Sequence, residues 1–371
     1  MRVASEAELV EAIRSAAEPL SLRGGNTRGM AGPGAPLSLV GLRGITLYEP
    51  GALTLVAQAG TPVAEIETTL AGEGQRLAFE PMDHRALMGA TGEPTIGGVF
   101  AANASGPRRL AVGAARDFLL GVRFVDGQGN VIKNGGRVMK NVTGYDLVKL
   151  LAGSRGTLGA LTEVSLKVLP EPETSATLVL CGLDDPAAIA AMAQAMRSPF
   201  EVTAAAHDPA RRRTYLRLEG FEASVTYRIG RLKDLLAATG AALESLAAEP
   251  SRTLWWGLRD VAAFHGAQGD VWRVHCRPTE APALAAKAGA EAHLYDWAGG
   301  LIWLRMAPGT DLRARLGLYD GHATLLRAED AAQTLPRQEP EAPGVARLTA
   351  GLRGKFDPRG IFNAEALALS T

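Results

Sequence analysis

The stretch that decides the fold is Thr95-Ile96-Gly97-Gly98-Val99-Phe100-Ala101-Ala102-Asn103-Ala104-Ser105-Gly106. Its paired glycines open a run of small residues, which lets a flat or extended ligand lie against the main chain. Two more glycine clusters flank it: Arg23-Gly24-Gly25-Asn26-Thr27-Arg28-Gly29, and Thr143-Gly144-Tyr145-Asp146 followed by Gly153-Ser154-Arg155-Gly156-Thr157-Leu158-Gly159. Backbone N–H groups in such loops can gather around an anion. The three clusters therefore favour a ligand that carries phosphate.

The first two clusters also have a purely structural explanation, and the spacing of the third does not by itself identify a ligand. The first suits an ordinary loop, and the second suits tight packing of a helix on a sheet. No Gly-x-Gly-x-x-Gly follows a predicted strand, and no Gly-x-x-x-x-Gly-Lys-Ser/Thr string is present. These absences argue against the Rossmann and P-loop classes of nucleotide-binding protein. A phosphate ligand would need another kind of cradle.

Local patterns around the clusters predict a mixture of helices and strands. A capping box at Ser5 predicts the first helix, and a second helix is expected to begin at Thr61-Pro62 and end at Gly72. Alternating apolar residues predict a strand over 161–169. The remaining expected elements of this region are strands over 20–23, 45–48 and 53–59, a hairpin over 121–133 and a short helix over 145–151. The predicted fold class is α+β.

The string Pro170-Glu171-Pro172-Glu173 predicts a domain boundary. Beyond it we expect strands near 177–181, 214–218, 271–276 and 301–306, and helices near 186–197, 231–248 and 281–290. This alternation predicts a smaller α+β domain with one antiparallel sheet and helices on one face. The predicted domains are therefore 1–170, 171–330, and a segment 331–371 whose linker and final helix return to the first domain.

Composition excludes several functional classes. The 371-residue chain has 39 basic and 39 acidic residues, which argues against a general nucleic-acid binder. Its two cysteines, Cys181 and Cys276, form no Cys-x-x-Cys, so the chain alone is not expected to hold an iron–sulfur cluster or a zinc finger. The sequence has no signal-peptide pattern and no transmembrane-length apolar run. We expect a cytoplasmic protein that meets a membrane only through partners.

The runs 95–106, 116–118, 144–147 and 153–163 resemble the FAD-binding domain of the vanillyl-alcohol oxidase type, also called PCMH-type. The resemblance covers roughly residues 1–170 and implies a domain of two α/β lobes that holds FAD in an extended pose. It also implies cofactor-binding roles for the residues that match the family's segments. These are Arg23, Gly24, Gly25, Asn26, Thr27, Thr95, Gly97, Gly98, Asn103, Ser105, Gly106, Arg116, Asp117, Gly144, Tyr145, Gly153, Ser154, Gly156, Leu158, Gly159, Glu163 and Asn363.

The same resemblance bears on how the flavin is held. Many relatives attach it covalently through a histidine in the first loop, whereas this chain has Asn26 or Thr27 at that position. We therefore expect non-covalent FAD, with His84 as a remote alternative for attachment.

Further strings narrow the resemblance. Residues 138–147, 296–304 and 321–324, with the tail around Asn363, are similar to the E subunits of bacterial glycolate oxidases. That likeness implies an FAD-binding subunit of a glycolate oxidase complex, which takes or relays electrons from a small 2-hydroxy acid. A second flavoprotein subunit and an iron–sulfur subunit are the implied partners.

Two other interpretations stay open: a self-sufficient FAD dehydrogenase of another small substrate, and a non-catalytic assembly subunit. The six histidines show no His-x-x-x-His or His-x-His spacing, so no metal site is expected. Arg259, Arg305 and Tyr145 are candidates for binding a carboxylate or hydroxyl, and nothing in the sequence singles out a catalytic residue. Trp255, Trp256 and Trp303 are expected in the core or at a subunit interface.

Overall fold

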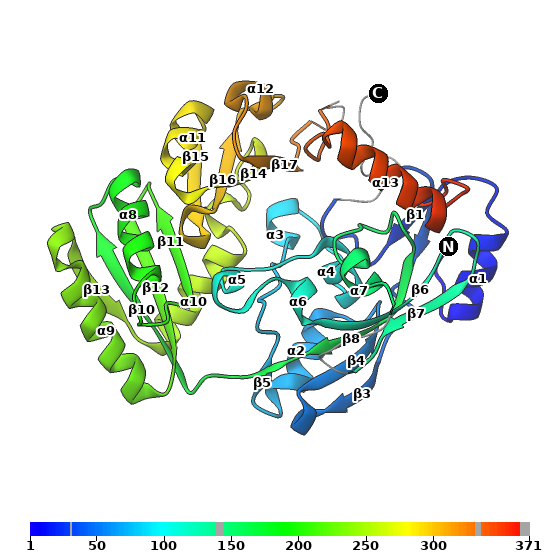
Figure 1. Ribbon diagram of the computed structural model, residues 1–371, viewed down its shortest axis with the longest axis horizontal. Coiled ribbons are helices and arrows are strands. Elements are labelled where there is room, and N and C mark those ends of the chain that lie inside the picture. Colours follow the sequence, from blue (N-terminus) through cyan, green and yellow to red (C-terminus); the bar gives the residue numbers. More distant parts are fainter. Residues whose placement is uncertain (30–31, 138–143, 331–334, 364–371) are drawn as a thin grey trace. The chain divides into compact units, whose positions relative to one another are not determined.

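The computed structural model describes residues 1–29, 32–137, 144–330 and 335–363. The chain divides into two units. Figure 1 colours the chain by residue number, so that the segments of each unit can be followed. Unit 1 contains Met1–Ser105, Gly113–Glu171 and the chain from Pro340 onward, and unit 2 contains Gly106–Val112 and Pro172–Glu339. The expected α+β class with antiparallel sheets is confirmed. Residues Gly106–Val112, which the sequence placed in the first domain, belong to unit 2.

Unit 1 is built on a five-stranded antiparallel sheet in the order β3-β4-β8-β6-β7 and on a parallel pair, β1-β2. A short pair, β5-β9, completes its sheets. Its elements are α1 (Glu6–Arg14), β1 (Leu20–Arg23), β2 (Ala35–Ser38), β3 (Ile45–Glu49), η1 (Pro50–Ala52), β4 (Thr54–Gln58), α2 (Val63–Ala71), β5 (Gln75–Arg76), α3 (Arg85–Met88), α4 (Ile96–Ala102), α6 (Ala115–Phe118), β6 (Leu119–Val125), β7 (Val131–Gly135), α7 (Leu147–Leu151), β8 (Ala160–Lys167), β9 (Leu169–Pro170) and α13 (Pro343–Phe356).

The apolar pattern of the sequence accounts for these elements. Along β8, Val164 and Leu166 are fully buried while Glu163 and Lys167 are partly exposed, as the alternation predicted. Ser5 caps α1 by accepting a hydrogen bond from the Glu8 amide. A separate core under β1 and β2 joins α1 to Ile361 and Phe362 near the C-terminus. Strand β1 leads straight into the first glycine cluster.

Unit 2 is built on an eight-stranded sheet in the order β13-β10-β12-β11-β15-β16-β14-β17, with every neighbouring pair antiparallel. Its elements are α5 (Arg109–Val112), β10 (Thr174–Cys181), α8 (Asp185–Met196), β11 (Ala204–Asp208), β12 (Arg213–Gly220), α9 (Glu222–Leu236), η2 (Ala237–Thr239), β13 (Ala242–Leu246), α10 (Ala248–Arg259), η3 (Ala262–Phe264), β14 (Asp270–Cys276), η4 (Pro278–Glu280), α11 (Ala281–Ala288), β15 (Ala292–Asp296), η5 (Trp297–Gly299), β16 (Leu301–Met306), α12 (Leu312–Leu316) and β17 (Gly321–Arg327).

Helices cover both faces of this sheet, so the expectation of helices on one face is wrong. Leu178 and Leu180 of β10 share a core with α8, α9, α11 and α12. Val179, which lies between them, packs with Trp255 of α10 on the opposite face. The sequence analysis missed α10, which is held on this face by the Trp255 indole donating to the Thr177 hydroxyl at 2.8 Å.

The helix predicted over 231–248 is correct as far as Leu236 and wrong beyond it. Helix α9 ends at Leu236, Gly240 adopts a left-handed conformation with φ of 71°, and β13 follows over 242–246. The alanine-rich composition indicated a helix, but Gly240 turns the chain so that β13 can pair with β10. The interpretation of the tryptophans as core holds for Trp255 and Trp303, whereas Trp256 is 53% exposed.

A polar cluster joins the two halves of the eight-stranded sheet. Strands β11 and β15 share only one paired position among the described residues, His207 with Tyr295. Beside it, the Asp185 carboxylate at the start of α8 accepts hydrogen bonds from the Tyr295 hydroxyl at 2.7 Å and from His293 at 2.8 Å. Burial raises the pKa of Asp185, but these hydrogen bonds outweigh burial and hold the pKa below its usual range. The charged carboxylate therefore stabilises the junction.

Replacing Asp185 with asparagine should lower the free energy of unfolding of unit 2 by about 1.5–3 kcal/mol at neutral pH, the usual contribution of a hydrogen bond to a charged group. Because the folded-state pKa of Asp185 lies below the unfolded value, its contribution is complete above the ordinary aspartate range and disappears as the pH falls below it. Denaturant unfolding of wild type and D185N at several pH values measures this. The difference between the two proteins should shrink in acid, and an equal difference at every pH would contradict the assignment.

Candidate cofactor site

The first glycine cluster forms one wall of a pocket in unit 1. After β1, the chain turns at Gly24 and Gly25, and Asn26 takes a left-handed conformation with φ of 52°. Gly25 lies so close to the segment before α4 that a Cβ atom there would fall 1.6 Å from the Glu93 carbonyl oxygen. Only glycine permits this contact of main chain with main chain. Gly25 thus fixes the loop against residues 92–95.

The second cluster forms the facing wall. Thr95 caps α4, because its hydroxyl accepts a hydrogen bond from the Gly98 amide at 3.3 Å. A Cβ atom at Gly98 would lie 3.1 Å from both Arg28 Nη1 and Thr95 Oγ1. The face of Gly98 is therefore bare main chain next to a guanidinium group.

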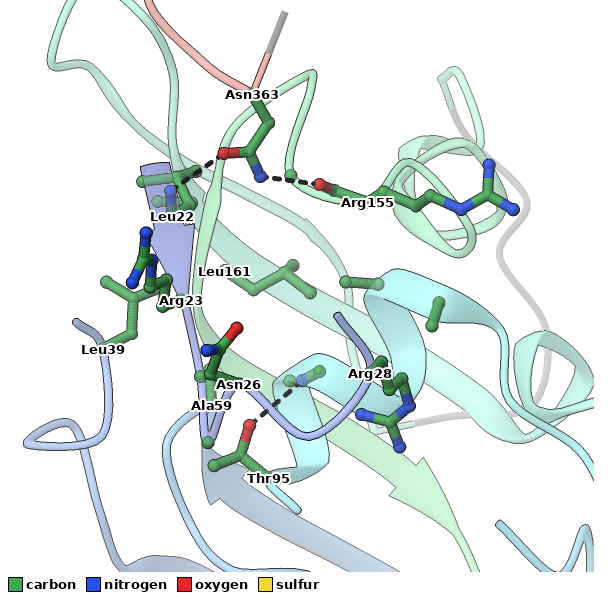
Figure 2. Close-up of a pocket in the computed structure, with 18 of the residues that line it drawn as sticks. Leu22, Arg23, Asn26, Arg28, Leu39, Ala59, Thr95, Arg155, Leu161 and Asn363 are labelled. Carbon is green, nitrogen blue, oxygen red and sulfur yellow. Dashed lines mark hydrogen bonds between the residues drawn. The ribbon is translucent and has the colours of Figure 1, made fainter. Parts of the chain in front are cut away.

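The pocket between these walls contains about 840 Å³ of space, part of it open to solvent. Figure 2 labels lining residues from β1 and the first loop, Thr95 at the start of α4, Arg155 and Asn363. The structure brings twelve of the predicted residues to this lining. They are Arg23, Gly24, Gly25, Asn26, Thr27, Thr95, Gly97, Gly98, Ser154, Gly156, Gly159 and Asn363.

Asn363 ties the pocket together from the far end of the chain. Its side-chain oxygen accepts from the Leu22 amide at 2.9 Å, and its side-chain nitrogen donates to the Arg155 carbonyl at 2.9 Å. Both hydrogen bonds are drawn in Figure 2. The preceding residue, Phe362, bridges to Leu20. The segment around Asn363 therefore holds β1, which leads into the first glycine cluster, beside the third glycine cluster.

Ten predicted residues do not line the pocket. Five of them brace the chain around the end of α4 and before α6 and α7. Asn103 accepts from the Arg116 amide at 2.9 Å, and the Arg116 guanidinium donates to the Ala152 carbonyl at 2.9 Å. The other bracing contacts are Ser105 Oγ with the Ala115 amide, the Asp117 carboxylate with the Ala114 amide, and the Gly153 amide with the Phe100 carbonyl.

The other five are dispersed. Gly106 lies in unit 2, where its carbonyl accepts from the Trp297 indole at 3.1 Å. Tyr145 is 88% exposed and Leu158 is buried. The remaining two are Gly144, which precedes α7, and Glu163, whose carboxylate accepts from the Thr46 hydroxyl at 3.3 Å. Cofactor contacts at these ten residues, and at the twelve that line the pocket, stay predictions. Thr143 and the string 138–142 lie outside the described residues.

Sequence reasoning missed nine lining residues. Seven are apolar and shape the walls: Leu22, Leu39, Ala59, Ala101, Ala102, Ala160 and Leu161. The other two are charged, Arg28 and Arg155. Arg28 lies inside the first glycine cluster, and that position was the available signal. The direction of the Arg28 side chain could not be predicted from the sequence, because neighbouring side chains of a loop point in different directions.

The lining has a strong positive bias. It contains Arg23, Arg28 and Arg155 and no acidic residue among the described positions. Burial lowers the pKa of Arg28 to about 10, with the charge of Asp83 acting in the opposite direction, and burial lowers the pKa of Arg155 to about 10. Both groups therefore keep their proton at neutral pH, and the pocket suits an anion such as a pyrophosphate.

No histidine or cysteine occurs among the described residues of the lining. His84, the remote alternative for covalent attachment, is buried elsewhere in unit 1, with Nδ1 lying 3.1 Å from the Met82 carbonyl. In unit 2, Arg259 pairs with Asp260 at 2.8 Å and Arg305 with Glu291 at 3.1 Å. Across the described ranges, no group of three or more His, Cys, Asp or Glu side chains is placed to hold a metal ion. The described helices include none with the length and apolarity needed to span a membrane.

Comparison with known proteins shows the family of the chain. Residues 1–135 match the family described as "FAD binding domain". The chain is 34% identical over 353 residues to the glycolate oxidase subunit GlcE of Escherichia coli strain K12, covering 93% of this chain and 91% of the relative. It is 37% identical over 127 residues to the glycolate oxidase subunit GlcD of Bacillus subtilis strain 168, covering 34% of this chain and 26% of that protein.

Solved structures support the fold. An alkyldihydroxyacetonephosphate synthase matches with a TM-score of 0.72 at 17% identity, over 98% of this chain and 76% of that chain. At this level of identity the match speaks for the architecture alone. The expected FAD-binding domain is confirmed by the family match, and the glycine clusters at 23–29 and 95–106 lie inside it.

Proposed function

Since the chain belongs to the family of the glycolate oxidase subunit GlcE, we propose that its pocket between residues 22–28 and 95–102 holds FAD without a covalent bond. The chain is an FAD-binding oxidoreductase subunit of the glycolate oxidase type. The single observation that supports the position of the cofactor is the pocket's combination of bare glycine walls with three arginines and no acidic group among its described lining residues.

The residues present fit the cofactor. Bare main chain at Gly98 allows close approach of an extended ligand, and the buried arginines provide positive charge for its pyrophosphate. Bound FAD would supply the acceptor for an electron pair, which amino-acid side chains cannot provide. The chain's own contribution is to orient that acceptor. Asn363 and Thr95 fix the walls against which it would lie.

We propose further that the chain works with a second flavoprotein subunit and an iron–sulfur subunit on a small 2-hydroxy acid. The relatives named GlcE and GlcD point to an assembly of several subunits. The proposed iron–sulfur subunit rests on chemistry. Cys181 and Cys276 are free, and two cysteines cannot supply the four ligands of a usual cluster. A cytoplasmic location, with membrane contact only through partners, stays a prediction.

The purified chain should contain FAD that acid or heat releases into the supernatant. The reason is that no nucleophilic histidine or cysteine lies in the described part of the lining. Chromatography of the released flavin distinguishes FAD from FMN, and the colour of the precipitate reports any attached flavin. Flavin that stays with the denatured protein would contradict non-covalent binding, and a chain that binds no flavin at all would contradict the proposed site.

A further inference from the structure

We propose that Arg28 is the cation that binds the pyrophosphate of the cofactor, and that this arginine destabilises the protein until the cofactor is bound. This inference rests on the proposed function, because it assumes that the pocket holds FAD. It adds a role for a residue that the sequence did not single out. It also gives that residue two effects of opposite sign, which can be measured separately.

The position of Arg28 supports the proposal. Its side chain comes from the first glycine cluster and is only 8% exposed. Nε and Nη2 are buried and have no hydrogen-bond partner among the residues that the structure describes. Nη1 lies at the Gly98 wall, 3.1 Å from the position of a Cβ atom on that glycine. Figure 2 shows the Arg28 side chain beside the ribbon of α4.

The other arginines of the pocket are placed differently. Arg23 is partly buried, and its Nε donates to the Ser21 hydroxyl at 3.1 Å. The Arg155 side chain extends away from Asn363 in Figure 2, although its Nε is also buried without a partner among the described residues. Arg28 is the lining arginine that combines burial, unpaired nitrogens and a position against bare main chain.

A buried guanidinium without hydrogen bonds lowers the stability of the folded protein, because it loses its hydration and no protein group replaces the hydrogen bonds to water. The charge of Asp83 offsets this cost only in part, since burial has the larger effect on Arg28 and the Asp83 carboxylate accepts from Arg85 at 2.7 Å. A pyrophosphate in the pocket would supply the missing acceptors. A guanidinium presents its N–H groups in a fixed fork that matches two phosphate oxygens.

Two measurements on Arg28→Met test the proposal. Methionine keeps an unbranched apolar stem of similar shape and removes the charge. We expect the dissociation constant for FAD to rise about 10- to 150-fold, which corresponds to about 1.4–3 kcal/mol. We also expect the flavin-free variant to melt at the same temperature as flavin-free wild type, or higher. Arg28→Lys keeps the charge without the forked N–H groups, so its affinity for FAD should lie between those of wild type and Arg28→Met.

A control variant separates these effects from loss of any arginine in unit 1. Arg123 lies outside the pocket lining and makes two hydrogen bonds of 2.7 Å to Glu6. Arg123→Met should therefore lower the melting temperature and leave the affinity for FAD unchanged, the opposite of the pattern for Arg28→Met. Riboflavin, which has no pyrophosphate, is the control ligand, and its affinity should not respond to Arg28→Met.

Each outcome decides a different claim. Wild-type affinity for FAD in Arg28→Met overturns the role of Arg28 and leaves the proposed function intact. A flavin-free Arg28→Met that melts lower than wild type, or fails to fold, overturns the claim that the unpaired charge is a burden. An equal loss for riboflavin and FAD would assign Arg28 to the pocket's shape and not to the pyrophosphate. Wild type that binds neither FAD nor riboflavin refutes the proposed function itself.

Discussion

The Gly98→Val variant is expected to lose FAD on purification, with affinity reduced on the order of 100-fold. A Cβ atom at this position would lie 3.1 Å from Arg28 Nη1 and from Thr95 Oγ1, and valine adds two more carbons at the lining. Overpacking of this kind costs about 1–3 kcal/mol, and displacement of Arg28 adds to it. Flavin content by absorbance, followed by titration with FAD, measures the effect.

A matched control exists in the same unit. Gly351 lies in α13, and no atom would lie within 4 Å of a Cβ atom there. Gly351→Val should keep a full complement of FAD. Gly25→Val is a poorer test, because its Cβ would meet the Glu93 carbonyl and disturb the loop with or without a cofactor. Retention of wild-type flavin by Gly98→Val would show that this wall does not contact the cofactor.

Loaded with FAD and alone, the chain should oxidise glycolate or D-lactate at a negligible rate. The chain has no His-x-x-x-His or His-x-His spacing that would favour a metal site for a 2-hydroxy acid, and it has only two cysteines. Arg259 and Arg305, the earlier candidates for a substrate carboxylate, are paired with Asp260 and Glu291. We expect activity to require the second flavoprotein subunit and the iron–sulfur subunit.

Rapid mixing under anaerobic conditions measures this directly. The visible absorbance of the bound flavin should stay constant when glycolate is added to the isolated chain, and should bleach when the partner subunits are present. Gly98→Val in the assembled complex is the companion measurement, since it tests whether this flavin lies on the route of the electrons. Fast bleaching of the isolated chain by glycolate would identify a self-sufficient dehydrogenase.

Much of the fold was predictable because the local signals agree with the tertiary structure. The glycine clusters, the hairpin turn at Asp126 and the alternation along β8 all report main-chain geometry, which the sequence encodes within a few residues. The helix predicted over 231–248 failed beyond Leu236 because residues 242–246 form β13. This strand gains its stability from pairing with β10, which is distant in sequence. Composition favoured a helix there, and tertiary pairing decided otherwise.

The parts of the site that main chain forms could be predicted from the sequence, whereas the directions of its side chains could not. The lining glycines of the first two clusters follow from the pattern, whereas the direction of Arg28 depends on how two distant loops meet. Asn103 and Arg116 were predicted to contact the cofactor because they match family segments, but they do not line the pocket. The Asn103 side chain accepts from the Arg116 amide, and the Arg116 guanidinium donates to the Ala152 carbonyl. A motif locates a segment, and only packing determines which of its side chains face the ligand.

The position of Asn363 has a consequence for the order of events during synthesis. Its two hydrogen bonds reach back 341 residues to Leu22 and 208 residues to Arg155. At about 5–20 residues per second, the ribosome needs roughly 10–40 s to travel from Arg155 to Asn363. During that interval both glycine loops have been made, but the residue that clamps them has not. We therefore expect the pocket to be complete, and to retain the cofactor stably, only after the C-terminal segment has left the ribosome.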